Sequence, residues 1–191
     1  MLQGDAPVGK HDHIDIVFDD GNLLRFNDPR RFGSLHWLGD SPWSHDLLTH
    51  LGPEPLQDAF DGEYLFKKSR KKKQATKQFI MDGKVVVGVG NIYANEALFI
   101  AGIRPGRAAG GVSAAAYRKL AVAIKQVLQD SIDMGGTTLR DFVGGDGKPG
   151  YFRQTLRVYD RAGLPCVDCE REIKSKRLGQ RSTYYCSNCQ S

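Results

Sequence analysis

The stretches Cys166-Val-Asp-Cys169 and Cys186-Ser-Asn-Cys189 decide how the end of this chain folds. They hold all four cysteines of the protein, as two Cys-x₂-Cys pairs separated by sixteen residues. This spacing suits two knuckles joined by a β-hairpin, with all four thiolates bound to one tetrahedral structural Zn²⁺. Two disulfides are the alternative, but pairs only two residues apart suit metal ligation better, and nothing upstream reads as a secretion signal.

The segment between the two pairs, residues 170–185, is strongly basic. Five arginines and lysines stand there against only two acids, Glu170 and Glu172. A unit this small cannot bury a core of its own, so a metal would stabilise it while its tip meets a polyanion. A solvated charged ribbon is the alternative. The knuckles alone indicate binding, most simply of nucleic acid, and do not indicate catalysis.

The composition of the whole chain agrees with an acidic partner. Its 191 residues, 40% of them hydrophobic, are enough to bury a core, and the formal net charge is +5 with a pI near 9.0. No apolar run approaches the length of a membrane span. We therefore expect a cytoplasmic protein that has no membrane partner.

The first forty residues alternate between apolar and polar side chains, which predicts three short strands near residues 14–18, 24–26 and 35–37. Between the second and third strands lies Asp28-Pro-Arg-Arg-Phe-Gly33. This stretch is either an ordinary proline turn or a loop tip that offers guanidinium groups and an aromatic wedge to nucleic acid. The stretch His11-Asp12-His13 could supply two metal ligands, but without a third ligand it reads better as surface.

From residue 40 to 55 the chain is rich in Pro, Gly and Ser, and after it the hydrophobic period becomes helical, so we place a domain boundary there. Residues 67–73 then carry six positive charges within a helix-forming segment. This tract is either a solvated face or a stripe that faces phosphates.

Two further helices are expected. In Gly88-Val-Gly90-Asn91 the glycines allow close backbone approach and Asn91 is a good N-cap for a helix that ends near Gly102. Helix N-termini bind phosphates, although a Gly-x-Gly turn alone is a weak signal. A longer helix, with an apolar stripe typical of a core helix, runs from a Ser113 cap to residues 135–136. The connection 102–112 is too long for one turn, so we expect a helix, two turns and a helix.

Five motifs along the chain, in this order, resemble those of the formamidopyrimidine-DNA glycosylase family. They are Asp-Pro-Arg-Arg-Phe-Gly at 28–33, Gly-Val-Gly-Asn-Ile-Tyr-Ala at 88–94, Gly-Gly-Thr-Thr-Leu-Arg-Asp-Phe at 135–142, Asp-Gly-Lys-Pro-Gly-Tyr-Phe at 146–152, and Gln-Arg-Ser-Thr-Tyr-Tyr-Cys at 180–186. The resemblance implies base-excision repair: removal of oxidised purines such as 8-oxoguanine and formamidopyrimidines from double-stranded DNA, followed by strand cleavage at the abasic site, by a monomer.

The resemblance also implies an α+β fold in four parts. A partial N-terminal β-sandwich would occupy residues 1–40 and a linker 41–62. A helix-two-turn-helix domain would occupy 63–150, with a lesion-capping loop at 135–151, and a zinc finger would occupy 152–191.

The same resemblance assigns roles to single residues. Arg30 would read the cytosine opposite the lesion, and Phe32 would wedge into the gap left by the flipped base. Arg181 would grip phosphate near the lesion and serve the second elimination step as a catalytic residue. The remaining DNA-binding residues would hold phosphates; they are His11, Lys73, Lys77 and Asn91.

The chain departs from the family at its front. The family uses an N-terminal proline as Schiff-base nucleophile, followed by a glutamate, whereas Leu2 and Gln3 stand at those positions here. We therefore expect a C-terminal part of a glycosylase that is inactive by itself. The alternative is a non-catalytic damaged-DNA-binding zinc module; an RNA-binding zinc ribbon would explain only the cysteines and basic residues.

Overall fold

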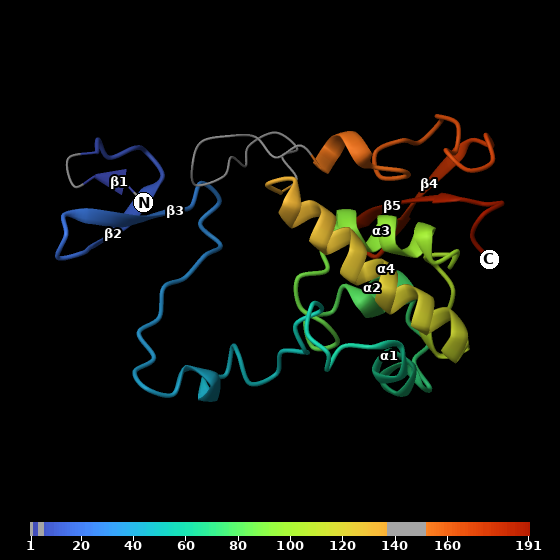
Figure 1. Cartoon of the computed structure of the whole chain (residues 1–191), viewed down its shortest axis with the longest axis horizontal. Coiled ribbons are helices and arrows are strands. Elements are labelled where there is room, and N and C mark those ends of the chain that lie inside the picture. The colour runs from blue at the N-terminus through green and yellow to red at the C-terminus, as the bar shows by residue number, and fades with distance from the viewer. Residues whose placement is uncertain (1, 4–5, 137–151) are drawn as a thin grey trace. The chain divides into compact units, whose positions relative to one another are not determined.

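The computed structural model of the chain describes residues 2–3, 6–136 and 152–191. It divides into two compact units, Met1–His45 and Asp46–Ser191 (Figure 1). The division falls within the predicted linker. Among the described residues, no helix is long and apolar enough to cross a membrane.

The first unit is a three-stranded antiparallel sheet in the order β1-β3-β2. The strands are β1 Leu2–Gln3, β2 Asp12–Val17 and β3 Asn22–Asn27. In the turn between β2 and β3, Gly21 has φ +80, a left-handed conformation that glycine adopts without strain. The prediction of a strand at residues 35–37 was wrong: these residues form no strand, and Leu2–Gln3 pairs with β3 instead. Alternation over three residues is too short to specify pairing.

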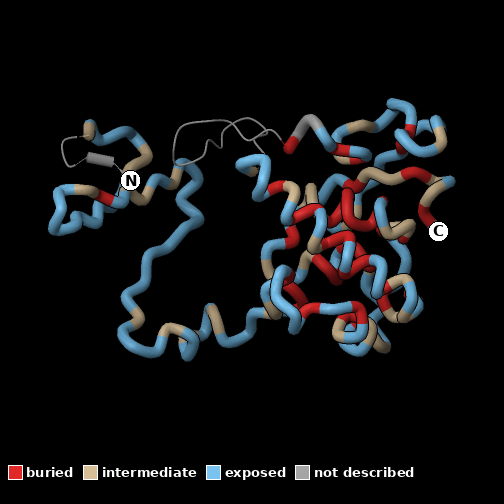
Figure 2. Tube along the Cα trace, viewed as in Figure 1, coloured by how far each residue is buried: buried red, intermediate tan, exposed pale blue. Residues whose placement is uncertain are grey.

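The second unit contains the main helices and the C-terminal hairpin. Its helices are α1 Gly62–Ser69, α2 Thr76–Ile80, α3 Asn91–Ile100 and α4 Ala114–Asp133, and its strands are β4 Ile173–Leu178 and β5 Arg181–Cys186. The helices enclose one apolar core, which includes Leu65, Phe79, Leu98 and Tyr117. Figure 2 shows the buried residues of this unit in red. The first residue of this core is Phe60, near the end of the predicted linker 41–62.

The structure confirms one predicted helix end and corrects two others. The Ser113 hydroxyl accepts from the N–H of Ala116 and caps α4, as predicted. Asn91 is not the N-cap of α3: Gly90 occupies that position, and Asn91 is the first helical residue. The basic tract also leaves the helix, because α1 ends at Ser69 and Lys71 adopts φ +64.

The C-terminal hairpin joins the two cysteine pairs. Strands β4 and β5 pair in antiparallel register, with Ile173 opposite Cys186 and Leu178 opposite Arg181, and Gly179 in the two-residue turn has φ +58. Ile173, Cys166 and Cys186 form a small second core with Phe99 of α3 and Val158. Sheet, helical domain and hairpin together confirm the predicted α+β class.

Candidate nucleic-acid interface and zinc site

The four cysteines converge on one point. Their sulfur atoms all lie within 4.8 Å of one another, with Cys166 Sγ 3.9 Å from Cys189 Sγ and Cys169 Sγ 3.5 Å from Cys186 Sγ. A tetrahedral site with Zn–S bonds of about 2.3 Å requires S···S separations of about 3.8 Å. The donor set and its spacing therefore fit one Zn²⁺, and none of the four is in a disulfide.

Lys77 connects α2 to the hairpin. Its side chain is buried, and Nζ donates to the Ser182 carbonyl at 2.7 Å and to Thr183 Oγ1 at 2.8 Å. Burial, with a smaller contribution from the charge of Arg181, lowers the pKa of Lys77 to about 8. The phosphate contact of Lys77 stays a prediction; in this structure its ammonium group is buried and holds the backbone at Ser182, directly after Arg181.

Asn95 connects the same strand to α3. It is completely buried; its Nδ2 donates to the Asn91 carbonyl at 2.7 Å, and its Oδ1 accepts from the N–H of Tyr184 at 2.8 Å. One side chain thus joins the first turn of α3 to β5. An amide with both a donor and an acceptor can satisfy both backbone groups at once.

Glu96, the next residue of α3, holds the segment that leads to the zinc module. It is 2% exposed, and its carboxylate accepts the N–H groups of Arg157, Val158 and Tyr159 at 2.8–3.0 Å. Three such donors compensate for the burial of the charge.

The end of the chain makes a third attachment. Gln190 Nε2 donates to the Ile103 carbonyl at 2.9 Å, and its Oε1 accepts from the N–H of Cys186. Ser191 forms backbone hydrogen bonds with Gly102 and Arg104. The zinc module is therefore fastened to both ends of α3 and to α2.

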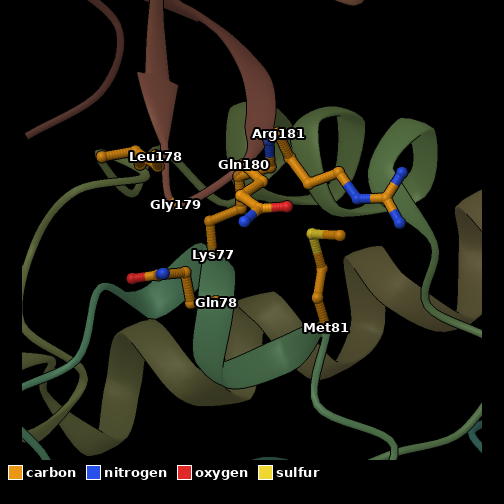
Figure 3. Close-up of a pocket in the computed structure, with 7 residues that line it drawn as sticks. All are labelled: Lys77, Gln78, Met81, Leu178, Gly179, Gln180 and Arg181. Carbon is orange, nitrogen blue, oxygen red and sulfur yellow. The ribbon is translucent and has the colours of Figure 1, made fainter.

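A pocket of about 160 Å³ lies where the hairpin tip meets α2 (Figure 3). Arg181 and Met81 line one side of it, and Leu178 and Gln78 line the other. Arg181 is exposed, and it follows directly after the turn residues Gly179 and Gln180. The arrangement presents one guanidinium group at the predicted hairpin tip.

The other sequence-predicted residues of the second unit occupy two places. Asn91 begins α3, whose N-cap is a glycine, so no side chain caps this helix among the described residues. An uncapped N-terminus offers backbone N–H groups to an anion. Lys73 is exposed in the segment between α1 and α2, after the end of the α1 helix.

The first unit carries His11, Arg30 and Phe32. The Asp28 carboxylate accepts the N–H groups of Gly33 at 2.6 Å and Arg30 at 3.1 Å, and these bonds hold the pKa of Asp28 below its usual value. Phe32 is 80% exposed, with the Arg30 guanidinium 4.9 Å from its ring centroid. The loop thus displays an arginine and an aromatic ring side by side. His11 lies in the turn before β2, where its carbonyl accepts the N–H of Asp28, the first residue of the loop, at 2.9 Å.

Comparison with known proteins identifies the family. Residues 51–143 match the formamidopyrimidine-DNA glycosylase H2TH domain, and residues 163–191 match the zinc finger found in FPG and IleRS. The formamidopyrimidine-DNA glycosylase of Hahella chejuensis is 60% identical over 190 residues, which cover 100% of this chain and 70% of that protein. The chain belongs to the formamidopyrimidine-DNA glycosylase family. The relative from Alcanivorax borkumensis is also 60% identical, with the same coverage.

Solved structures agree with this assignment. The crystal structure of MutM (Fpg) from Thermus thermophilus has a TM-score of 0.85 and 37% identity, covering 96% of this chain and 70% of that one. The Lactococcus lactis Fpg in complex with DNA containing an abasic site has a TM-score of 0.88 and 32% identity, covering 100% and 70%. These matches confirm the resemblance found in the motifs, and they favour a glycosylase over a non-catalytic module. With the geometry above, the four cysteines form the single structural zinc site of a formamidopyrimidine-DNA glycosylase zinc finger.

The sequence reasoning missed two of the residues that hold the interface together. The sequence pattern assigned no role to Asn95 or Glu96, although both are buried and bonded to distant backbone. A signal was present: two adjacent polar residues interrupt an otherwise apolar helix, and a buried polar group needs a partner.

Proposed function

We propose that this chain binds, as a monomer, double-stranded DNA carrying an oxidised purine, and that it supplies DNA-binding groups for excision of the base and cleavage at the abasic site. The substrate class is that of formamidopyrimidines and 8-oxoguanine. The relatives' names supply the formamidopyrimidine part of this class. The structural support is a pair of anion-binding groups held in a fixed relation.

That pair consists of the start of α3 at Asn91 and the guanidinium of Arg181. Asn95 bonds the Asn91 carbonyl and the Tyr184 N–H, and Lys77 bonds the Ser182 carbonyl directly after Arg181. Because both connecting side chains are buried, the helix start and the hairpin tip are held relative to each other. A fixed spacing between two phosphate-binding groups suits a rigid phosphate backbone.

The remaining roles are proposals of the same kind. Asn91, His11 and Lys73 would contact phosphates, and Arg181 would contact phosphate near the lesion and assist the second elimination step. Arg30 would read the opposing cytosine and Phe32 would fill the space of the flipped base. The proposed capping loop at 135–151 lies outside the described residues beyond residue 136.

The test is binding to duplexes that carry a stable abasic-site analogue, with Asn91→Ala/Arg181→Ala as the variant. Loss of a charged phosphate contact of about 1.5–3 kcal/mol predicts an affinity at least about 10-fold lower for the double variant. Arg118→Ala/Lys119→Ala, which removes two exposed cations at the start of α4, is the control and should bind normally. Equal binding by the two variants would contradict the proposal, as would an unmodified chain that shows no affinity for the duplex.

A further inference from the structure

A second cationic surface extends from the hairpin to the segment before α2. Residues 72–77 and 105–110 run antiparallel, joined by Gly110 N–H to the Lys72 carbonyl at 2.9 Å, Ala109 N–H to the Gln74 carbonyl at 2.9 Å and Thr76 N–H to the Arg107 carbonyl at 2.7 Å. This irregular ribbon brings the exposed side chains of Lys72, Lys73 and Arg107 onto one structural unit. In the sequence, Arg107 is more than thirty residues from Lys72 and Lys73.

The hairpin continues this surface. An added Cβ at Gly106 would lie 2.7 Å from Lys176 Nζ, so the Lys176 ammonium rests directly against the residue before Arg107. Lys176 is opposite Thr183, and Lys174 is opposite Tyr185. Directly opposed residues share a face, and so do alternate residues of a strand, so Lys174, Lys176 and Arg181 lie on one face of the hairpin.

Tyr185 fixes this part of the surface. Its ring has Lys176 Nζ at 5.3 Å from the centroid and Arg104 Cζ at 6.0 Å. Arg104 also donates to the Ser187 carbonyl at 2.9 Å. An aromatic ring between two cations holds them close together despite their repulsion.

The charges of this surface have no carboxylate partner in the part of the chain that the structure describes. We define the flank track as Lys72, Lys73, Arg107, Lys174 and Lys176. Among the described residues the ion pairs are Arg25 with Asp12, Arg25 with Asp15, and Lys67 with Glu63, so no member of the flank track has a carboxylate within 4.0 Å. Like charges gathered without counter-charges lower stability unless a polyanion neutralises them.

We propose that the flank track binds the arm of double-stranded DNA on one side of the lesion, beyond the phosphates near Asn91 and Arg181. The surface begins on the hairpin face that carries Arg181 and leads through Lys176 and Gly106 to Arg107 and Lys72. A duplex carries one charge per about 1.7 Å of axis, which matches a row of cations better than an isolated anion does. The inference rests on the proposed function, since it extends the same DNA interface.

The experiment compares duplexes that carry one central abasic-site analogue. One has short arms of about 6 base pairs, and two others extend a single arm, left or right, to about 16, which adds about 34 Å at 3.4 Å per base pair. The full chain is compared with Lys72→Gln/Arg107→Gln/Lys176→Gln. The control is Lys67→Gln/Lys119→Gln/Arg171→Gln, which removes the same charge at exposed positions outside the track.

We expect the unmodified chain to bind the duplex extended on one particular side about 10-fold or more tightly than the short duplex at 0.15 M salt. The track variant should lose this gain in affinity. The slope of log K against log salt should fall by about 0.9 per lost contact, close to 3 for the triple variant, on the duplex extended on that side. Binding of the short duplex should change less than about twofold. The control variant should keep the gain, and zinc content and circular dichroism should show that both variants fold.

Two outcomes overturn the inference and leave the proposed function standing: equal affinity of the unmodified chain for all three duplexes, or equal loss of the gain in the track and control variants. An RNA duplex that shows the same arm-dependent gain as DNA would also overturn the assignment to DNA. If the unmodified chain fails to bind even the short duplex, the proposed function itself fails.

Discussion

At the scale of single residues, Lys77 shows how position decides chemistry. A lysine four residues after Lys73 reads as part of one basic stripe, yet Lys73 is exposed while Lys77 is 1% exposed and bonded to Ser182 and Thr183. A buried ammonium group is stable only where acceptors surround it. Lys77 therefore positions the strand that begins at Arg181, and its ammonium group has acceptors within the protein.

The lowered pKa of Lys77 gives a pH-dependent prediction. Its pKa is about 8 in the folded chain against 10.5 ordinarily, so between these values the unfolded chain binds more protons than the folded one. Stability from this residue therefore rises with pH across that window, by at most about 1.4 kcal/mol per pH unit, and is constant below pH 8. In denaturant unfolding from pH 7 to 10, the free energy of unfolding of the wild type should rise relative to that of Lys77→Met. Lys72→Met, at an exposed position, controls for the loss of one lysine, and a constant difference between the wild type and Lys77→Met would contradict the buried position.

Arg30 carries the second residue-scale prediction. If its guanidinium reads the base opposite the lesion, Arg30→Ala should reduce the preference for cytosine by about 1–3 kcal/mol, since that is the value of a good base-edge contact. Competition binding with the four opposing bases measures this preference. Arg31→Ala, in the same loop, is the matched control. Uniform weakening for all four bases would show instead that Arg30 contacts phosphate.

At the scale of elements, the zinc hairpin is stable because of attachments at its base and its side. The metal organises Cys166 to Cys189, while Asn95, Lys77 and Gln190 connect the hairpin to α3, α2 and residue 103. A small core of Phe99, Val158 and Ile173 lies beneath it. The hairpin therefore depends on the metal and on the helical domain together.

We predict that Cys186→Ser releases the zinc and unfolds the hairpin, because structural zinc supplies much of the folding free energy of such a unit. The zinc content measured by metal analysis should fall from one zinc per chain to none, and hydrogen exchange at the Tyr184 amide should accelerate. The core helix α4 should stay protected, since its buried side chains lie in the separate helical core. Asn188→Ala, an exposed residue of the same knuckle, should keep the metal. A Cys186→Ser protein with a full zinc content would refute this prediction.

At the scale of the whole molecule, the predicted DNA-contacting residues are divided between two units. His11, Arg30 and Phe32 belong to the first, and Asn91, Arg181 and the flank track belong to the second. Each unit alone offers only part of the chemistry that the resemblance implies. In the proposed roles, the second unit supplies most of the phosphate contacts, and the first unit supplies His11 and the residue that reads the opposing base.

Catalysis gives the prediction at this scale. Schiff-base formation needs an unprotonated amine placed at the sugar. Lys77, the lysine with a lowered pKa, is enclosed by Ser182 and Thr183. We therefore expect this polypeptide to bind lesion DNA without forming a borohydride-trapped complex. A covalent adduct of the 191-residue chain would disprove the prediction.

The sequence by itself determined the family, the zinc ligands, helix α4 with its Ser113 cap, and the hairpin with Arg181 at its tip. These features depend on local spacing: two residues between cysteines, a capping hydroxyl, a turn glycine. Only the tertiary structure decided that Leu2–Gln3 and not residues 35–37 pairs with β3, that Lys77 is buried, and that Asn95 and Glu96 fasten the zinc module. It also brought Lys72, Arg107 and Lys176 into one track. The physical reason is that burial and pairing depend on partners distant in sequence, which the local pattern of a single chain does not specify.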